Sequence, residues 1–219
     1  GPDGRLVVPR LEPAQDAHRC PLCGIDYPVV DGIACVPADL PAMRGYLDGS
    51  TPESLVEMFL PAAFAVSQWP ESVEGAPGLP DLSDNVALID RLAGWIACHA
   101  RPVAGADERS IEVGCGTGRF LTRLSGLFPG GAVGLDLRLS LLRVARRLLD
   151  GDVAEVRLRL EGSRLAPIRV APAERPAGPV TLVLGDAMAP PFLAESFPVV
   201  AAVSLLDTVP DPLFVLGQL

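Results

Sequence analysis

A glycine-rich segment in the middle of the chain has the residue types and spacing of a ligand-binding turn. Residues 111–119 read Ile-Glu-Val-Gly-Cys-Gly-Thr-Gly-Arg, with glycine at every second position from Gly114 to Gly118. Glycine tolerates the backbone conformations of a tight strand-to-helix turn and lets a ligand approach the backbone closely. The dinucleotide-binding pattern G-x-G-x-x-G requires a further glycine where this chain has Arg119. The spacing therefore favours a less negatively charged ligand, and an ordinary tight turn is the alternative.

Aspartates follow the other short apolar runs in this half of the chain. Asp136 lies 20 residues after Gly116, Asp186 follows Gly185, and Asp207 follows the run that ends at Leu206. A carboxylate in the place of Asp136 accepts hydrogen bonds from both hydroxyls of a ribose, and Asp186 is placed to accept one from an adenine amino group. One such aspartate is usually a helix cap or turn former, but a series at successive strand ends predicts a nucleoside site.

Cys20 and Cys23 form the only closely spaced pair among the five cysteines. Two thiolates at this C-x-x-C spacing can bind one tetrahedral zinc ion, but a structural site needs two further ligands and the sequence has no second C-x-x-C. A turn without metal therefore stays the alternative, and Pro21 argues against a redox motif. Because five unevenly spaced cysteines are not a disulfide framework, we expect a reduced, cytoplasmic protein.

Short apolar runs alternate with helical patterns from residue 110 onwards. Helices are predicted at 119–127 and 140–149, and buried strands at 111–113, 132–137, 180–184 and 199–206. This alternation predicts an α/β fold with a Rossmann-like parallel sheet that is flanked by helices and covered on both faces. Ligands bind such sheets at the carboxyl ends of the strands, where the glycines and aspartates lie.

Composition divides the chain into three parts. Residues 1–42 predict a small cysteine-containing β module, residues 43–100 a helical linker or lid segment, and residues 101–219 the domain that holds the sheet. Ser50, followed by threonine, proline and glutamate, predicts the start of a helix in the second part. Apolar residues that alternate with arginine predict a β-hairpin insertion near residues 154–170.

The charge balance narrows the classes of partner. The net charge is −9, with 27 acidic residues against 18 arginines and no lysine. A protein that binds duplex nucleic acid through its phosphates usually carries a basic face, so we expect no broad footprint of this kind, and a local arginine patch stays the alternative. Without lysine, Schiff-base chemistry and the phosphate-binding loop GxxxxGK[ST] are excluded. No run of 18 apolar residues and no leader-like start is found, so we expect no membrane partner.

Four segments between residues 109 and 212, IEVGCGTGR, VGLDLRLSLLRVAR, LVLGDAMAPPF and VVAAVSLLDTVPDP, resemble the consecutive nucleoside-binding motifs of class I S-adenosylmethionine-dependent methyltransferases. The resemblance implies S-adenosylmethionine as the cofactor. It places Asp136 at the ribose, Leu137 on the adenine ring, and Asp186 with Ala187 at the adenine amino edge. The methionine part of the cofactor would be surrounded by Glu112, Gly114, Cys115, Gly116, Gly118 and Leu205.

The family's sheet normally has seven strands, whereas few residues follow the fourth predicted strand here. We therefore expect an incomplete chain, or a homo-oligomer or partner chain that completes the sheet, because an open apolar edge is a liability. The stretch CPLCGIDYPVVDGI resembles part of the zinc-ribbon-like modules found beside or fused to methyltransferases. This implies a partial zinc-ribbon-like module with Cys20 and Cys23 as zinc ligands.

The resemblance implies direct methyl transfer, to which the protein contributes alignment and desolvation. Residues 204–207, Ser-Leu-Leu-Asp, lack the Pro-Pro-aromatic signature of DNA amino-methylating enzymes and the Pro-Cys nucleophile of cytosine C5 methylation. Together with the acidic charge, this favours a small-molecule or peptide acceptor, with no DNA partner and RNA disfavoured. Two alternatives stay open: a non-catalytic scaffold or regulatory partner, and a ribosomal RNA methyltransferase. The sequence identifies no catalytic residue.

Overall fold

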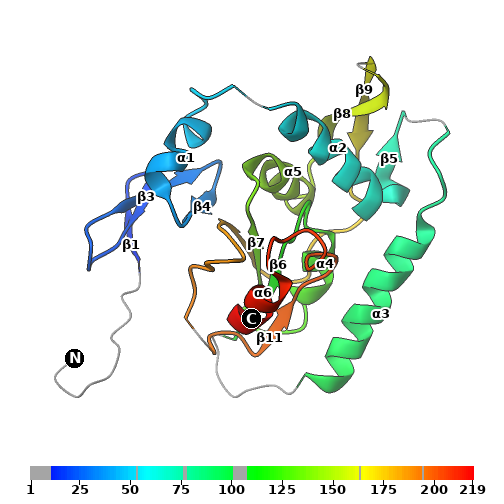
Figure 1. The fold of residues 1–219 in the computed structure, drawn as a ribbon. Helices are drawn as coiled ribbons and strands as arrows, with labels where there is room; N and C mark the ends of the chain where they lie inside the picture. The colour runs from blue at the N-terminus through cyan, green and yellow to red at the C-terminus, as the bar shows by residue number, and fades with distance from the viewer. Residues whose placement is uncertain (1–10, 53, 76–77, 101–107, 163, 194) are drawn as a thin grey trace.

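The computed structural model describes residues 11–52, 54–75, 78–100, 108–162, 164–193 and 195–219. The first ten residues of the expected module 1–42 and the expected domain start at 101–107 lie outside these ranges. The described chain forms one eight-stranded sheet and one three-stranded sheet (Figure 1). The strand order of the larger sheet is β1-β2-β3-β4-β10-β7-β6-β11.

Five neighbouring strands of the larger sheet run parallel: β4 (Ile33–Cys35), β10 (Val180–Leu184), β7 (Ala132–Asp136), β6 (Ser110–Val113) and β11 (Val199–Ala201). All four residues of β6 and the first four of β7 are buried. Near-continuous apolar sequence is typical of parallel strands, because both faces of such a sheet are covered. The predicted α/β fold with a Rossmann-like parallel sheet is therefore confirmed.

The N-terminal strands extend this sheet. Antiparallel pairing joins β1 (Glu12–Ala14), β2 (Ala17–Arg19), β3 (Asp26–Val30) and β4 in sequence order. Asp31 and Gly32 make the β3–β4 turn with φ values of 52° and 74°, the positive φ pair of a tight type I′ hairpin. Leu184 then pairs with Cys35, and the amide of Val36 donates to the carbonyl of Leu184 at 2.8 Å.

Two arginines of α5 (Leu139–Leu149) bind the β3–β4 turn of this N-terminal module. Arg143 Nε lies 2.7 Å from a carboxylate oxygen of Asp31, and Arg146 donates to the carbonyl of Gly32 at 2.9 Å. The sequence predicts a separate module, whereas the structure joins it to the sheet by a strand ladder and to α5 by these contacts. The pairing partner of β4 lies far along the chain, so no local pattern reveals it.

One face of the sheet is covered by helices. The main core cluster combines strand residues with side chains from α1 (Leu40–Leu47), α3 (Ser83–His99), α4 (Arg119–Leu124) and α5. The other face is covered by Phe192 and Phe197, whose rings meet edge to face at 5.1 Å between centroids. A cleft of about 180 Å³ lies there beside the end of α6 (Pro212–Gln218). In the described residues the β10–β11 crossover contains no helix, and the helix at this face is α6, whose end lines the cleft together with Ile111 and Val113 of β6.

A second small core holds α2 (Leu55–Gln68). A hairpin is predicted near residues 154–170, and there β8 (Ala154–Glu161) pairs antiparallel with β9 (Arg164–Val170). The other edge of β9 pairs antiparallel with β5 (Val73–Glu74), which follows the short helix η1 (Pro70–Ser72). Figure 1 shows this hairpin beside α2. Buried residues of α2, α5 and the hairpin pack together there: Ala62, Ala65, Val66, Trp69, Val144, Leu148, Ala154, Val156, Ile168 and Val170.

The predicted helix start at Ser50 is wrong. The amide of Ser50 donates to Asp48 Oδ1 at 2.9 Å and so belongs to the turn after α1. The N-cap of α2 is Ser54, whose Oγ accepts from the amide of Glu57 at 3.2 Å. Both serines precede a glutamate three positions on, so the capping pattern alone does not distinguish them.

Candidate functional site

The expected ligand-binding residues of four strands meet at one edge of the parallel sheet. Glu112 lies in β6, Asp136 ends β7, Asp186 follows β10, and Leu205 lies beyond β11. The ends of β7 and β10 are tied directly, because the amide of Gly185 donates to the carbonyl of Asp136 at 3.0 Å. The topology therefore brings together side chains that the sequence spreads over almost a hundred residues.

The glycine-rich turn follows β6 and is built from left-handed backbone. Gly114, Gly116 and Gly118 have φ values of 76°, 57° and 82°, which residues with a Cβ rarely adopt. A Cβ on Gly114 would lie 2.8 Å from Leu205 Cδ1, and one on Gly116 would lie 2.7 Å from the side chains of Phe64 and Gln68. Glycine is thus required at these positions by conformation and by close neighbours.

Glu112 is a buried carboxyl group with an unsatisfied oxygen. It is 3% exposed, and its Oε2 has no hydrogen-bond partner in the described part of the chain. Burial raises its pKa well above the ordinary value, and the nearby Asp136 raises that pKa further. An orphaned buried carboxyl group is costly unless a partner satisfies it. A cationic or hydrogen-bond-donating ligand group beside the glycine turn would supply that partner.

Asp136 is bound to backbone amides but keeps acceptor capacity. Its Oδ2 accepts from the amide of Gly116 at 2.9 Å, and its Oδ1 from the amide of Arg138 at 3.0 Å. Burial raises its pKa, and these hydrogen bonds partly oppose the rise. A carboxylate has about four lone-pair sites, so both oxygens can still accept ligand hydroxyls. The adjacent Leu137 is 49% exposed and offers an apolar surface next to them.

The remaining expected site residues are Asp186, Ala187 and Cys115, and they differ in what they can offer a ligand. Asp186 Oδ1 accepts from the amide of Met188 at 2.8 Å, which shapes the loop after β10. Ala187 packs against the core cluster on the sheet face that Phe192 and Phe197 cover. The thiol of Cys115 is fully buried, and a Cβ on Gly134 would lie 2.9 Å from its sulfur. Cys115 as a whole is 0% exposed, and its backbone N–H and carbonyl are bonded to Leu135 and Gly118, so it offers a ligand no free group. Burial raises the pKa of its thiol.

The C-terminal end of α2 lies across the glycine turn, a contact that no pattern in the sequence predicts. Gln68 Oε1 accepts from the amide of Thr117 at 3.0 Å and from its hydroxyl at 2.7 Å. The indole of Trp69, fully buried, donates to the carbonyl of Thr117 at 3.3 Å. No local sequence signal marks Gln68, because its partner lies 49 residues along the chain.

Comparison with known families identifies the C-terminal half of the chain. Residues 111–219 match the model of a family described as a methyltransferase domain. This part of the chain is a methyltransferase domain. It begins in β6, one residue before Glu112, and contains the glycine turn, Asp136, Asp186 and Leu205. No curated protein matches the sequence.

Solved structures similar to this chain include several methyltransferases, all at low identity. The YcgJ protein from Bacillus subtilis is 16% identical, with 59% of this chain and 44% of that chain covered and a TM-score of 0.41. CalS10 from Micromonospora echinaspora, an amino pentose methyltransferase solved with S-adenosylmethionine bound, is 19% identical, with 65% and 50% covered and a TM-score of 0.39. A putative S-adenosylmethionine-dependent methyltransferase from Methanococcus maripaludis is 12% identical, with 66% and 61% covered and a TM-score of 0.41. The chain thus spans about half the length of these structures.

The N-terminal helices hold the loop after β7 of the methyltransferase domain. Glu57, 7% exposed, accepts hydrogen bonds from Arg138, Ser140 and Tyr46. The Tyr46 hydroxyl in turn accepts from the amide of Leu139 at 3.0 Å. Burial alone would raise the pKa of Glu57, but the hydrogen bonds from Ser140 and Arg138 hold it below its ordinary value. This Tyr46–Glu57–Arg138 latch fixes the segment that directly follows Asp136.

The cysteine pair supplies only half of a zinc site. Cys20 and Cys23 lie in a turn in which the amide of Gly24 donates to the carbonyl of Cys20 at 2.8 Å. The backbone N–H groups of Cys23 and Leu22 lower the pKa of the Cys20 thiol. Among the described residues, no group of three potential metal ligands comes together. The described residues around this cysteine pair do not supply the four ligands of a tetrahedral zinc site, so we assign no function to zinc.

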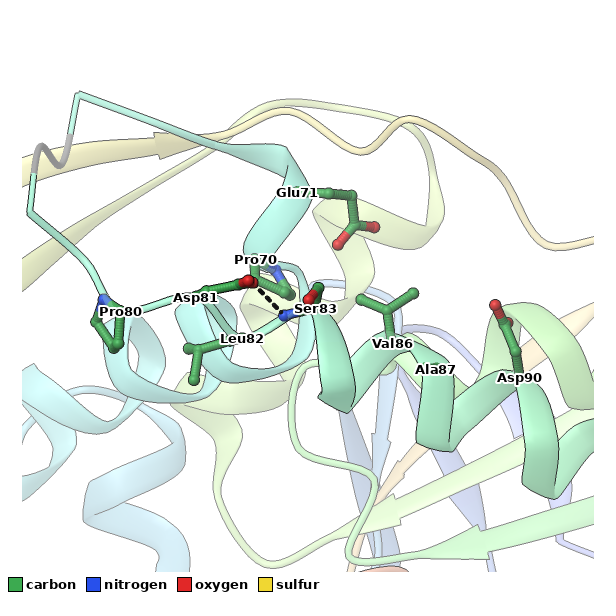
Figure 2. A pocket seen from close by; sticks show the side chains of 9 residues that line it. All are labelled: Pro70, Glu71, Pro80, Asp81, Leu82, Ser83, Val86, Ala87 and Asp90. Carbon is green, nitrogen blue, oxygen red and sulfur yellow. Dashed lines mark hydrogen bonds between the residues drawn. The ribbon is translucent and has the colours of Figure 1, made fainter.

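An acidic cleft of about 540 Å³ lies between η1 and the start of α3 (Figure 2). Three carboxylates line it: Glu71, Asp81 and Asp90. Glu71 pairs with the buried Arg119 at 2.8 Å, and Asp90 pairs with Arg123 at 2.7 Å. Asp81 accepts from the amide of Ser83 at 2.9 Å, the dashed line in Figure 2. Each acid already has a structural partner, so the cleft presents little unsatisfied charge.

Proposed function

We propose that the chain binds S-adenosylmethionine at the glycine turn of its methyltransferase domain and transfers the methyl group to a small-molecule or peptide acceptor. The observation that carries this proposal is the buried carboxyl group of Glu112, whose Oε2 has no hydrogen-bond partner among the described residues, beside the cradle formed by Gly114 and Gly116. When bound, S-adenosylmethionine supplies a methyl group on a positively charged sulfur.

The residues present fit this ligand. The ligand's ammonium or sulfonium charge would satisfy Glu112, and two ribose hydroxyls would donate to the carboxylate of Asp136. The exposed face of Leu137 suits an adenine ring, and Asp186 at the next strand end suits its amino group. The chain's own contribution to the reaction is then to align the donor and to exclude water around it.

The charges support an acceptor other than a nucleic acid. The chain carries a net charge of −9. Two arginines of α5 that could form a basic patch, Arg143 and Arg146, are held by Asp31 and Gly32 of the N-terminal module. A polyanion would therefore approach a field that is unfavourable on balance. In the described residues, no helix is long and apolar enough to cross a membrane.

Calorimetric titration with S-adenosylhomocysteine tests the binding step. Asp136→Ala should weaken binding by about 10- to 150-fold, the range that corresponds to losing a hydrogen bond to a charged group. Asp152→Ala, the same change at an exposed aspartate after α5, is the matched control and should leave the affinity unchanged. Absence of binding to the unmodified chain would refute the proposal.

Transfer of a labelled methyl group tests the reaction and the acceptor class. The unmodified chain would be incubated with labelled S-adenosylmethionine and pools of small molecules, peptides or total RNA at low salt. Label in small molecules or peptides supports the proposed acceptor. Label in RNA would contradict it in favour of the ribosomal RNA alternative, and binding without transfer to any pool would favour the non-catalytic scaffold.

A further inference from the structure

The carboxamide of Gln68 has a fixed orientation at the glycine turn. The backbone N–H of Thr117 can only donate, so the atom of Gln68 that meets it at 3.0 Å must be the carbonyl oxygen Oε1. The hydroxyl of Thr117 donates to the same oxygen at 2.7 Å. With Oε1 held by two donors, the amide nitrogen Nε2 necessarily points to the other side.

That nitrogen lies directly over the glycine turn. A Cβ on Gly116 would lie 2.7 Å from Nε2, so nothing larger than glycine separates the amide from the turn. In the described part of the chain no acceptor is hydrogen-bonded to Nε2. The helix that carries Gln68 is well anchored, because Trp69 is fully buried and α2 packs on the β8–β9 hairpin. The donor is thus held in place in advance, which lowers the entropic cost of binding a ligand.

The surrounding cations are already paired. Arg138 is bound to Glu57, and the buried Arg119 lies 2.8 Å from carboxylate oxygens of both Glu71 and Glu174. The other charged groups nearest the turn, Glu112 and Asp136, are acids and repel an anion. In the described residues, Nε and Nη1 of Arg119 also lack a hydrogen-bond partner, but they are buried beside Glu71 and Glu174. Nε2 of Gln68 is therefore the side-chain donor that we assign to the anionic end of a zwitterionic ligand at this turn.

We propose that Gln68 is a cofactor-binding residue whose Nε2 donates a hydrogen bond to the carboxylate of the methionine moiety of S-adenosylmethionine. Thr117 acts as the positioning residue that orients the amide. This inference rests on the proposed function and deepens it, because it places the amino-acid end of the ligand at α2 and the nucleoside end at Asp136. A helix outside the residues matched by the family model then completes the site.

The test compares two ligands that differ only in this carboxylate: S-adenosylmethionine and its decarboxylated analogue. Gln68→Glu keeps an oxygen for both Thr117 donors but replaces the amide nitrogen with a second, repelling oxygen. We expect its affinity for S-adenosylmethionine to fall about 10- to 100-fold in calorimetry, with less than a twofold loss for the decarboxylated analogue. Gln68→Ala should show the same selectivity with a smaller loss.

Gln15→Glu, which adds the same charge at an exposed turn, is the matched control and should change neither affinity. Thermal melts establish that each variant is folded before its affinity is compared. An equal loss for both ligands would show that Gln68 only supports the fold, and an unchanged affinity for S-adenosylmethionine would remove Gln68 from the site. Either result overturns this inference alone. Failure of the unmodified chain to bind either ligand would overturn the proposed function together with it.

Discussion

Replacing the buried carboxyl group of Glu112 should stabilise the ligand-free protein and weaken ligand binding. Glu112 is 3% exposed, and its Oε2 has no partner in the described residues. Glu112→Gln keeps the shape of the side chain and removes a group that must either hold a proton or carry an uncompensated charge.

A buried unsatisfied group costs about 1–3 kcal/mol, and more when it is charged, so replacing the acid with the neutral amide of glutamine should gain about 1–3 kcal/mol at pH 8. For a chain of this length, about 2–4 °C in Tm corresponds to each kcal/mol, so the Tm should rise by roughly 2–12 °C. The same substitution removes the proposed partner of the ligand's positive charge. Affinity for S-adenosylmethionine should therefore fall while the stability of the ligand-free protein rises.

The stability gain should grow with pH. Burial raises the pKa of Glu112 in the folded protein, whereas the unfolded chain has the ordinary value near 4.5. Above that pH the unfolded chain releases a proton that the folded protein retains, so the folded state binds more protons and loses stability as the pH rises. Glutamine does not titrate. The Tm difference between Glu112→Gln and the unmodified chain should be larger at pH 8 than at pH 5.

Thermal melts between pH 5 and pH 8 measure this difference, with Glu161→Gln at an exposed position of β8 as the matched control. The control should show no growing gain over this range. A lower Tm for Glu112→Gln at every pH, or a gain that does not change with pH, would refute the account of Glu112 as a buried and unsatisfied acid.

Two further predictions concern the latch and the cysteines. Tyr46→Phe removes the hydroxyl that accepts from Leu139 and donates to Glu57, so the free energy of unfolding should fall by about 1–3 kcal/mol in denaturant titration; an unchanged value would show that the latch carries no stability. Neighbouring N–H groups lower the pKa of the Cys20 thiol, whereas burial raises the pKa of the Cys35 thiol to about 11. In alkylation followed by mass spectrometry, Cys20 should therefore react before Cys35. Equal labelling rates of the two cysteines in the folded protein would contradict this order.

The sequence determined the features that depend on neighbouring residues. The apolar runs that become β6, β7 and β10 mark the buried parallel strands, because their periodicity is local. The glycine spacing from Gly114 to Gly118 marks the turn, because left-handed backbone excludes most other residues. The aspartates after β7 and β10 could be placed at one edge from strand direction alone, since parallel strands end on the same side.

The tertiary structure decided what depends on partners far along the chain. Pairing of β4 with β10 joins residues separated by almost 150 positions, and backbone hydrogen bonds leave no trace of their partner in side-chain identity. Gln68 reaches the glycine turn because a hydrophobic cluster shared with the β8–β9 hairpin holds α2 there. Glu57 finds Arg138 across 81 positions in the same way. These contacts arise from packing of whole elements, and packing is set by shape and burial in three dimensions rather than by spacing along the chain.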